Sequence, residues 1–200
     1  MNMNASLPVV AALAAVLSTG CGEAGGAAER TVPGPEELSA TAEVKALPAT
    51  TLVFAEQVGG FQGAGEVYDV LLERILAWAE LAGQWKFPET TRIVSVYPDG
   101  DEVSPERQRL WFGITADAAA AESLPEGLRS MTLPAGDYAV GSFRIREEEF
   151  GAAWGWMYGA ALEALGVRPR DGYAFEVQRN DSSEDAEQRH EIDICVPVVR

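Results

Sequence analysis

Apolar residues recur at helical spacing in two stretches of the chain. In each stretch they step by three and four residues, and the acidic residues between them lie mostly on the other side. This spacing predicts two amphipathic helices, the second running from Phe150 to Leu165. Gly83 and Gly166 stand where helix-ending glycines are expected. The apolar face of the first helix is formed by Val67, Val70, Leu71, Ile75 and Trp78.

Short stretches rich in β-branched and aromatic residues surround the two helices. One such stretch precedes each helix and two follow it, which predicts a β-α-β-β order in each half of the chain. The links Pro98-Asp99-Gly100-Asp101 and Asn180-Asp181-Ser182-Ser183 have the composition of turns. The six predicted strands are 51–55, 91–97, 109–114, 138–143, 173–178 and 191–196.

The folded part of the chain repeats itself. Leu47-Pro48-Ala49 recurs 86 residues later as Leu133-Pro134-Ala135, and the same offset relates Tyr68 to Trp154. We therefore expect an α+β fold of two β-α-β-β modules related by a pseudo-twofold axis, with an antiparallel sheet, two helices and a pocket at the module junction. The halves cover about 42–117 and 128–200, within one domain of 42–200.

The first twenty residues are typical of an export signal. Residues 1–20 carry no charged side chain, and the apolar run 7–17 would rise about 16 Å as a helix, short of a ~30 Å bilayer. Leu17-Ser18-Thr19-Gly20-Cys21 resembles a bacterial lipoprotein cleavage site. We expect a lipoprotein signal peptide at 1–20 and lipidation at Cys21. A cleaved signal without lipid and a short buried apolar helix are the alternatives.

Residues 21–41 are rich in glycine, alanine, glutamate and proline and have little apolar surface to bury. We interpret them as a flexible tether that holds the domain off the membrane. The expected location is the periplasmic side of a bacterial membrane. The outer membrane is preferred, because Gly22 follows Cys21 in place of the aspartate that often signals retention in the inner membrane.

The charge balance narrows the classes of partner. The chain has 31 acidic and 15 basic residues, a formal net charge of -16. Such a surface repels phosphate backbones and anionic lipid headgroups, so we expect no nucleic acid and no membrane contact except through the lipid. A cationic small molecule would be attracted.

With both halves laid out, the sequence resembles the GyrI-like family, also known as the AraC-type effector-binding domain, from about Ala42 to Val198. The resemblance implies two β-α-β-β modules around a pocket for small, often aromatic or cationic molecules. It also implies that Glu176 is the family's pocket glutamate, because it follows Phe175. The resemblance is carried, in order, by residues 43–49, 58–65, 133–140, 175–177, 180–181 and 192–198.

The chain departs from the family pattern in three places. It contains no helix-turn-helix, so control of transcription by this chain is not expected. Residues 144–150 replace a Gly-Pro-Tyr-like turn, and Gln178 replaces a commonly aromatic position. These differences change the shape of the expected pocket and therefore its ligand.

The candidate ligand-binding residues are one acid and several aromatic residues. Glu176 alternates with Phe175 and Val177, so it faces the opposite side of its strand, either the pocket or solvent. Trp154 and Tyr158 lie one turn apart on the apolar face of the second helix, where they either pack in the core or line the pocket. Three further candidates complete the set: Trp156, off the apolar stripe at the pocket rim or exposed, and Tyr68 and Tyr97.

Other chemistries lack the residues they need. The glycines of 59–65 do not have dinucleotide or phosphate-loop spacing. His190 is the only histidine, and its charged neighbours predict an exposed turn, so we expect neither a metal nor a cofactor. Cys195 lies in an alternating strand and is expected to be a buried structural thiol.

Three functions remain open. The leading hypothesis is a lipid-anchored, non-catalytic binder of small hydrophobic, aromatic or cationic molecules outside the cytoplasm. The alternative is a GyrI-like hydrolase of strained-ring electrophiles, in which Glu176 acts as general base and Tyr158 or Trp154 positions the substrate. The third is a structural or interaction lipoprotein without a ligand.

Overall fold

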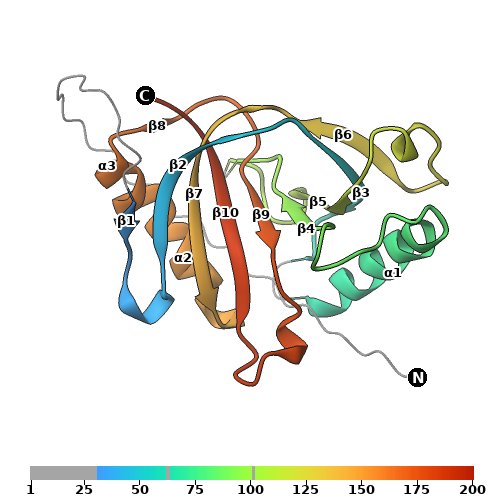
Figure 1. Ribbon diagram of the computed structural model, residues 1–200, viewed down its shortest axis with the longest axis horizontal. Helices are drawn as coiled ribbons and strands as arrows, with labels where there is room; N and C mark the ends of the chain where they lie inside the picture. Colours follow the sequence, from blue (N-terminus) through green and yellow to red (C-terminus); the bar gives the residue numbers. More distant parts are fainter. Residues whose placement is uncertain (1–30, 62–63, 101) are drawn as a thin grey trace.

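The structure, a computed structural model, describes residues 31–61, 64–100 and 102–200. It is a mixed α+β fold with one large antiparallel sheet and two main helical segments, as the sequence predicts (Figure 1). The strands are β1 (Val32–Pro33), β2 (Thr41–Leu47), β3 (Thr50–Val58), β4 (Ile93–Val96), β5 (Arg109–Thr115), β6 (Arg129–Leu133), β7 (Gly136–Ile145), β8 (Arg168–Pro169), β9 (Phe175–Gln178) and β10 (His190–Val199). The helical segments are η1 (Glu36–Leu38), α1 (Gly65–Leu81), η2 (Ala120–Glu122), η3 (Glu147–Glu149), α2 (Phe150–Trp156), the π-helical η4 (Met157–Ala161), α3 (Leu162–Leu165) and η5 (Ser182–Glu184).

The centre of the sheet is the junction between the two halves of the sequence. The strand order is β1-β2-β7-β10-β9-β4-β5-β3-β6, with β8 paired to β10. Strand β4 of the first half therefore pairs with β9 of the second, with Ser95 opposite Glu176 and Ile93 opposite Gln178. All six predicted strands are present, and the predicted pseudo-twofold arrangement places β4 and β9 side by side.

The first strand of each half pairs with the other half. Strand β2 runs beside β7, and β6 runs beside β3. The repeated Leu-Pro-Ala sequences at 47–49 and 133–135 form the two connections, β2 to β3 and β6 to β7, that cross from one half of the sheet to the other (Figure 1). The halves are therefore interlocked in one domain.

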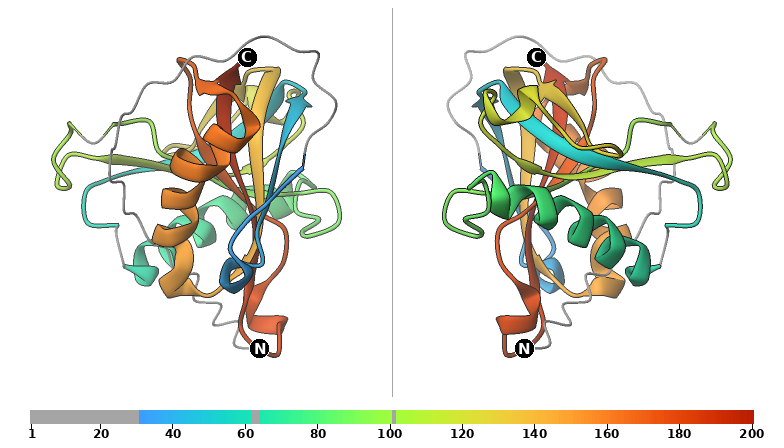
Figure 2. Two further views of the ribbon diagram at one scale, coloured as in Figure 1. Left: turned by 90° about the vertical axis from the view of Figure 1, so that its left-hand side faces the viewer. Right: turned by 90° about the vertical axis from the view of Figure 1, so that its right-hand side faces the viewer.

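Both helical segments cover the same face of the sheet, on either side of β9 and β4 (Figures 1 and 2). Helix α1 packs over β5 and β3 and closes one apolar cluster, which includes Ile75, Phe112 and Ile114. Helices α2 and α3 close a second cluster, which includes Met157 and Ile194. The other face of the sheet has its own cluster of buried apolar side chains, among them Phe175 and Cys195.

The helices differ in detail from the apolar stripes read from the sequence. In α1, Val70 is 56% exposed, whereas Tyr68 and Ala79 are fully buried, so the buried face is rotated from the predicted one. The second helix is continuous in prediction but contains the π-helical turn η4, within which Gly159 has non-helical backbone angles. A π turn accommodates an extra residue, and Tyr158 is correspondingly turned outward, at 38% exposure.

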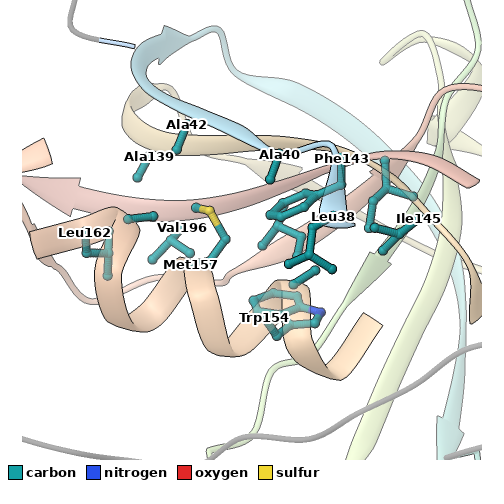
Figure 3. Close-up of a cluster of buried hydrophobic side chains, with 14 of the residues drawn as sticks. Leu38, Ala40, Ala42, Ala139, Phe143, Ile145, Trp154, Met157, Leu162 and Val196 are labelled. Atoms are coloured by element: carbon teal, nitrogen blue, oxygen red, sulfur yellow. The ribbon is translucent and has the colours of Figure 1, made fainter. Parts of the chain in front are cut away.

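The folded body begins before the predicted boundary at residue 42. Leu38 and Ala40 are buried in the cluster under α2 (Figure 3), and β1 pairs with β2 at the sheet edge. Residues 31–41 thus pack against the domain, contrary to a flexible tether over that range, because two apolar side chains find a place in the core. The remaining residues of the predicted tether, the leader and Cys21 lie outside the described residues.

Within the part of the chain that the structure describes, none of the helices has both the length and the apolar character that crossing a bilayer requires.

Candidate functional site

A polar stripe crosses the helix-covered face of the sheet at the junction of the two halves. On β9, the side chains on this face are Glu176 and Gln178, and on β4 the corresponding position is Ser95, followed by Tyr97. The adjacent strands present apolar residues at these levels: Phe112 and Ile114 on β5, and Ile192 and Ile194 on β10. Polar groups at the centre of an otherwise apolar layer are a functional-site signal, because burying them opposes folding.

Glu176 is the buried acid of this stripe. Its residue is only 3% exposed, so the alternative of a solvent-facing carboxylate is wrong. The Tyr97 hydroxyl donates a hydrogen bond to its Oε2 over 3.2 Å, and the indole Nε1 of Trp154 donates to its Oε1. The site therefore combines one aromatic donor from each half of the fold on one carboxylate.

The surroundings make this carboxyl group a weak acid. Burial raises the pKa of Glu176 to about 7, against an ordinary value of 4.5, and the hydrogen bonds from Trp154 and Tyr97 partly oppose that rise. Both donors are neutral, and Glu176 forms no ion pair with a basic residue of the described chain. The acid is therefore close to the protonation midpoint near neutral pH and has no built-in cation.

Aromatic rings pack on one another and on the two donors of the carboxylate. The rings of Tyr97 and Trp154 meet edge to face, with their centroids 5.9 Å apart. The ring centroid of Phe61 lies 6.4 Å from that of Tyr97. Tyr158 stacks on the outer side of Trp154 at 5.9 Å with nearly parallel planes. Tyr97 packs against both helix-side clusters, which places it at the seam between the halves. The site therefore consists of one buried acid held among aromatic side chains.

Tyr68 completes the group from helix α1, at the position that the repeat relates to Trp154. It is fully buried and packs edge to face on Phe112 at 5.3 Å. Its hydroxyl has no hydrogen-bond partner of acceptable geometry among the described residues. Its pKa is raised, first by burial and then by the negative charge of Glu176, with a smaller opposing effect from the Tyr97 hydroxyl. This hydroxyl is thus a second polar group of the site without a fixed partner.

Five of the six predicted ligand-binding residues belong to this group: Glu176, Trp154, Tyr158, Tyr68 and Tyr97. The sixth, Trp156, points elsewhere. It packs edge to face on Phe143 at 5.7 Å and lies beside Gly34, beneath the N-terminal segment.

A second acid, Glu56, resembles Glu176 in accepting an indole hydrogen bond but lies on the other face of the sheet. Trp111 donates to it over 2.9 Å, and Arg129 pairs with it over 3.2 Å. Glu56 follows Phe54 by two residues on β3, and Phe54 belongs to the cluster on that opposite face. Glu56 is therefore a structural acid that already has a basic partner.

Sequence reasoning did not assign three residues of the site. Phe61 stands alone among glycines, and Ser95 is a single polar residue in an apolar strand. Gln178 departs from the family pattern, and its place two residues after Glu176 puts both side chains on one face. That spacing is the sequence signal for Gln178.

The other chemical candidates are structural. His190 is buried and packs edge to face on Phe150 at 5.4 Å, so the predicted exposed turn is wrong. Burial lowers its pKa. Cys195 is buried, and burial raises its pKa, in agreement with a structural thiol. Across the described ranges there is no group of three or more histidine, cysteine, aspartate or glutamate residues placed to hold a metal ion.

Comparison with known families identifies this architecture. Residues 41–199 match the GyrI-like small molecule binding domain. The chain belongs to the GyrI-like family. The match covers both halves and every residue of the polar stripe, so this GyrI-like domain is a small-molecule-binding domain.

Curated relatives agree with the assignment. This GyrI-like domain is 32% identical over 136 residues to a DNA gyrase inhibitor of Serratia proteamaculans. The aligned region covers 66% of this chain and 85% of the relative. It is likewise 32% identical over 129 residues to a DNA gyrase inhibitor of Edwardsiella piscicida, over 62% and 79% of the two chains.

Solved structures share the fold at low sequence identity. The EcmrR C-terminal domain has a TM-score of 0.63 at 11% identity, over 80% of this chain and 98% of that one. EcmrR in a complex with DNA has a TM-score of 0.62 at 13% identity, but the GyrI-like domain covers only 58% of that protein. SAV2435 bound to tetraphenylphosphonium has a TM-score of 0.51 at 13% identity, over 79% and 93% of the two chains.

Proposed function

We propose that this chain is an exported, lipid-anchored protein that binds small hydrophobic cations, with Glu176 as the group that pairs with the positive charge. The carrying observation is a buried carboxylate whose hydrogen-bond donors are all neutral. A buried anion without a cationic partner is costly, and a ligand that brings the missing charge recovers that cost.

The aromatic residues supply the rest of the recognition. Trp154, Tyr97 and Tyr158 present ring edges and faces around or next to the carboxylate. Cations are attracted to aromatic faces, and flat apolar groups gain from leaving water. The net charge of -16 adds a long-range attraction for cations. Tetraphenylphosphonium, the ligand of the similarly folded SAV2435, combines both properties.

The same charge argues against a role on nucleic acid for this chain, although EcmrR acts in a DNA complex. Gyrase inhibition, the activity named for the relatives, requires access to the cytoplasm. The predicted leader 1–20 and lipidation at Cys21 would place this chain on the far side of the membrane, periplasmic and preferentially at the outer membrane. Export therefore separates it from gyrase.

The binding proposal is tested by isothermal titration of tetraphenylphosphonium into the purified protein at pH 8. We expect saturable 1:1 binding that Glu176→Gln weakens at least tenfold. Glu56→Gln is the matched control, because Glu56 also accepts an indole hydrogen bond but faces the other side of the sheet. Equal affinity in the parent and Glu176→Gln would contradict the assignment. Conversion of a ligand to product, lost in Glu176→Gln, would favour the hydrolase.

The location is tested separately by cell fractionation of the parent and Cys21→Ser. The parent is expected in the membrane fraction, released by detergent and carrying acyl chains detectable by mass spectrometry. Cys21→Ser is expected to lose the acyl mass. A parent protein found in the cytoplasm without acylation would overturn the location while leaving the binding result intact.

A further inference from the structure

We propose that Gln178 makes the site select cations that carry N–H donors, namely protonated amines and amidines with an aromatic group, over quaternary cations. This selectivity rests on the proposed function of Glu176 and adds a second acceptor to it.

The two residues are placed to act together. Gln178 follows Glu176 by two positions on β9, so their side chains leave the same face with Cα atoms about 7 Å apart. A ligand with the dimensions of a benzene ring and one polar group can span that separation. The carboxylate would take the positive charge, and the amide oxygen would take a hydrogen bond.

The cross-strand neighbours of Gln178 offer its amide group no hydrogen bond from a side chain. They are Ile93 on β4 and Ile192 on β10, both buried and apolar. Each isoleucine belongs to one of the two helix-side clusters, so Gln178 occupies the seam between them. An amide side chain between two apolar clusters destabilises the fold. A role in ligand binding accounts for its presence there.

The amide oxygen is an unsatisfied acceptor. Gln178 is only 6% exposed, and its Oε1 has no hydrogen-bond partner among the residues that the structure describes. Buried acceptors without a donor are rare in native proteins because each loses its hydration without compensation. The Tyr68 hydroxyl is a second unsatisfied group near Glu176. Both atoms can accept a hydrogen bond. The amide oxygen of Gln178, unlike the hydroxyl of Tyr68, cannot donate one.

These acceptors distinguish classes of cation. A primary ammonium or an amidinium carries several N–H donors, so it can pair with Glu176 and also donate to Gln178. A quaternary ammonium or phosphonium has no N–H, and its binding leaves the Gln178 oxygen buried and unpaired. A site that offers an unpaired acceptor discriminates against a ligand without the matching donor.

The test is a pair of aromatic cations of similar size, benzamidine and phenyltrimethylammonium, titrated into the purified protein at pH 8. The parent is expected to bind benzamidine about tenfold more tightly, which corresponds to one hydrogen bond to a buried acceptor. Gln178→Met keeps the length of the side chain and removes the acceptor. It is expected to weaken benzamidine about tenfold and to change phenyltrimethylammonium less than twofold.

Folding is monitored in the same samples. Because Gln178→Met removes an unsatisfied buried group, its melting temperature is expected to equal or exceed that of the parent. Gln178→Leu serves as the second variant if methionine disturbs the packing, with the same expected loss of preference.

The outcomes separate the two proposals. One outcome is that Glu176→Gln loses both cations while both Gln178 variants keep the benzamidine preference of the parent. This outcome would overturn the role of Gln178 and leave that of Glu176 intact. Parent protein that prefers phenyltrimethylammonium would overturn it as well. Failure of both probes and of tetraphenylphosphonium to bind the parent would overturn the proposed function itself, together with this selectivity.

Discussion

Tyr97 from the first half of the chain donates its hydroxyl hydrogen to Glu176 from the second half, over 3.2 Å and across the central strand pair. The hydrogen bond joins the two repeats at the point where their polar side chains meet. Trp154 approaches the same carboxylate from helix α2 and contacts the Tyr97 ring edge to face. The properties of the acid therefore depend on residues from both repeats.

Replacing Tyr97 by phenylalanine tests this dependence. The hydroxyl helps to hold the pKa of Glu176 down, so Tyr97→Phe is expected to raise that pKa above about 7. The proposed binding of cations requires the ionised acid, so the pH midpoint of tetraphenylphosphonium affinity is expected to move upward. Titrations from pH 5 to 9 measure it. Tyr173→Phe, which removes the hydroxyl of a ring that packs on Trp111, is the control and should leave the midpoint unchanged.

The pH dependence of stability gives an independent measure of the same acid. The folded-state pKa of Glu176, about 7, lies above its ordinary value of 4.5, so the folded protein keeps a proton that the unfolded chain releases. The contribution of this group is fully present below pH 4.5 and is lost as the pH rises through 7, a change of about 3 kcal/mol.

Urea unfolding of the parent and Glu176→Gln at pH 4 to 9 checks this sign. The free energy of unfolding of the parent should fall relative to the variant between pH 4.5 and 7, and the two should then run parallel. A difference that is constant over the whole range would show that Glu176 has the same pKa in both states.

The loop before α1 offers a matched pair of glycines. Gly59 and Gly60 both have positive φ, +62° and +63°, but a Cβ on Gly59 would lie 2.5 Å from the backbone oxygen of Glu106. A Cβ on Gly60 would meet nothing within 4 Å. Gly60→Ala is expected to cost about 1 kcal/mol from its backbone conformation alone.

Gly59→Ala is expected to cost at least another ~1 kcal/mol, because the loop must move. Since this loop leads to Phe61, which packs near Tyr97, cation affinity should fall in Gly59→Ala more than in Gly60→Ala. Thermal unfolding and the tetraphenylphosphonium titration measure both effects. Equal losses in the two variants would show that the Glu106 contact does not matter.

The N-terminal segment is expected to contribute to the stability of the domain. Leu38 is 4% exposed in the cluster under α2 (Figure 3), and Leu38→Ala should destabilise by about 2 to 4 kcal/mol. Glu36→Ala, at an exposed position of the same short helix, should change stability by less than about 0.5 kcal/mol. Urea unfolding distinguishes a packed segment from a tether, for which both variants would be neutral.

Local patterns in the sequence predict the elements and the acid. The period of apolar residues marks both helices, and the repeated Leu-Pro-Ala marks equivalent points in the halves. Alternation around Phe175 and Val177 turns Glu176 to the opposite face, and the resemblance to the family identifies that face as the site side. Each of these signals depends on residues close together in the chain.

Pairings between strands that are far apart in the sequence cannot be predicted from such local patterns. Nothing near Thr41 shows that β2 runs beside β7, because the register depends on residues about a hundred positions later. The direction of Trp156 depends on Phe143 and on the N-terminal segment packing above it. The exposed-turn prediction for His190 failed because Phe150 covers the ring, which its charged sequence neighbours do not indicate.

The exchange of first strands between the repeats has a consequence for the origin of the fold. One repeat alone would leave its first strand without a neighbour. Its second strand would lose the pairing partner that the other repeat supplies. Two copies of such a single-repeat ancestor could complete each other as a twofold-symmetric, strand-swapped dimer. Once the copies are joined into one chain, equivalent positions of the two repeats can diverge. One repeat then has an acid, Glu176, where the other has a serine, Ser95.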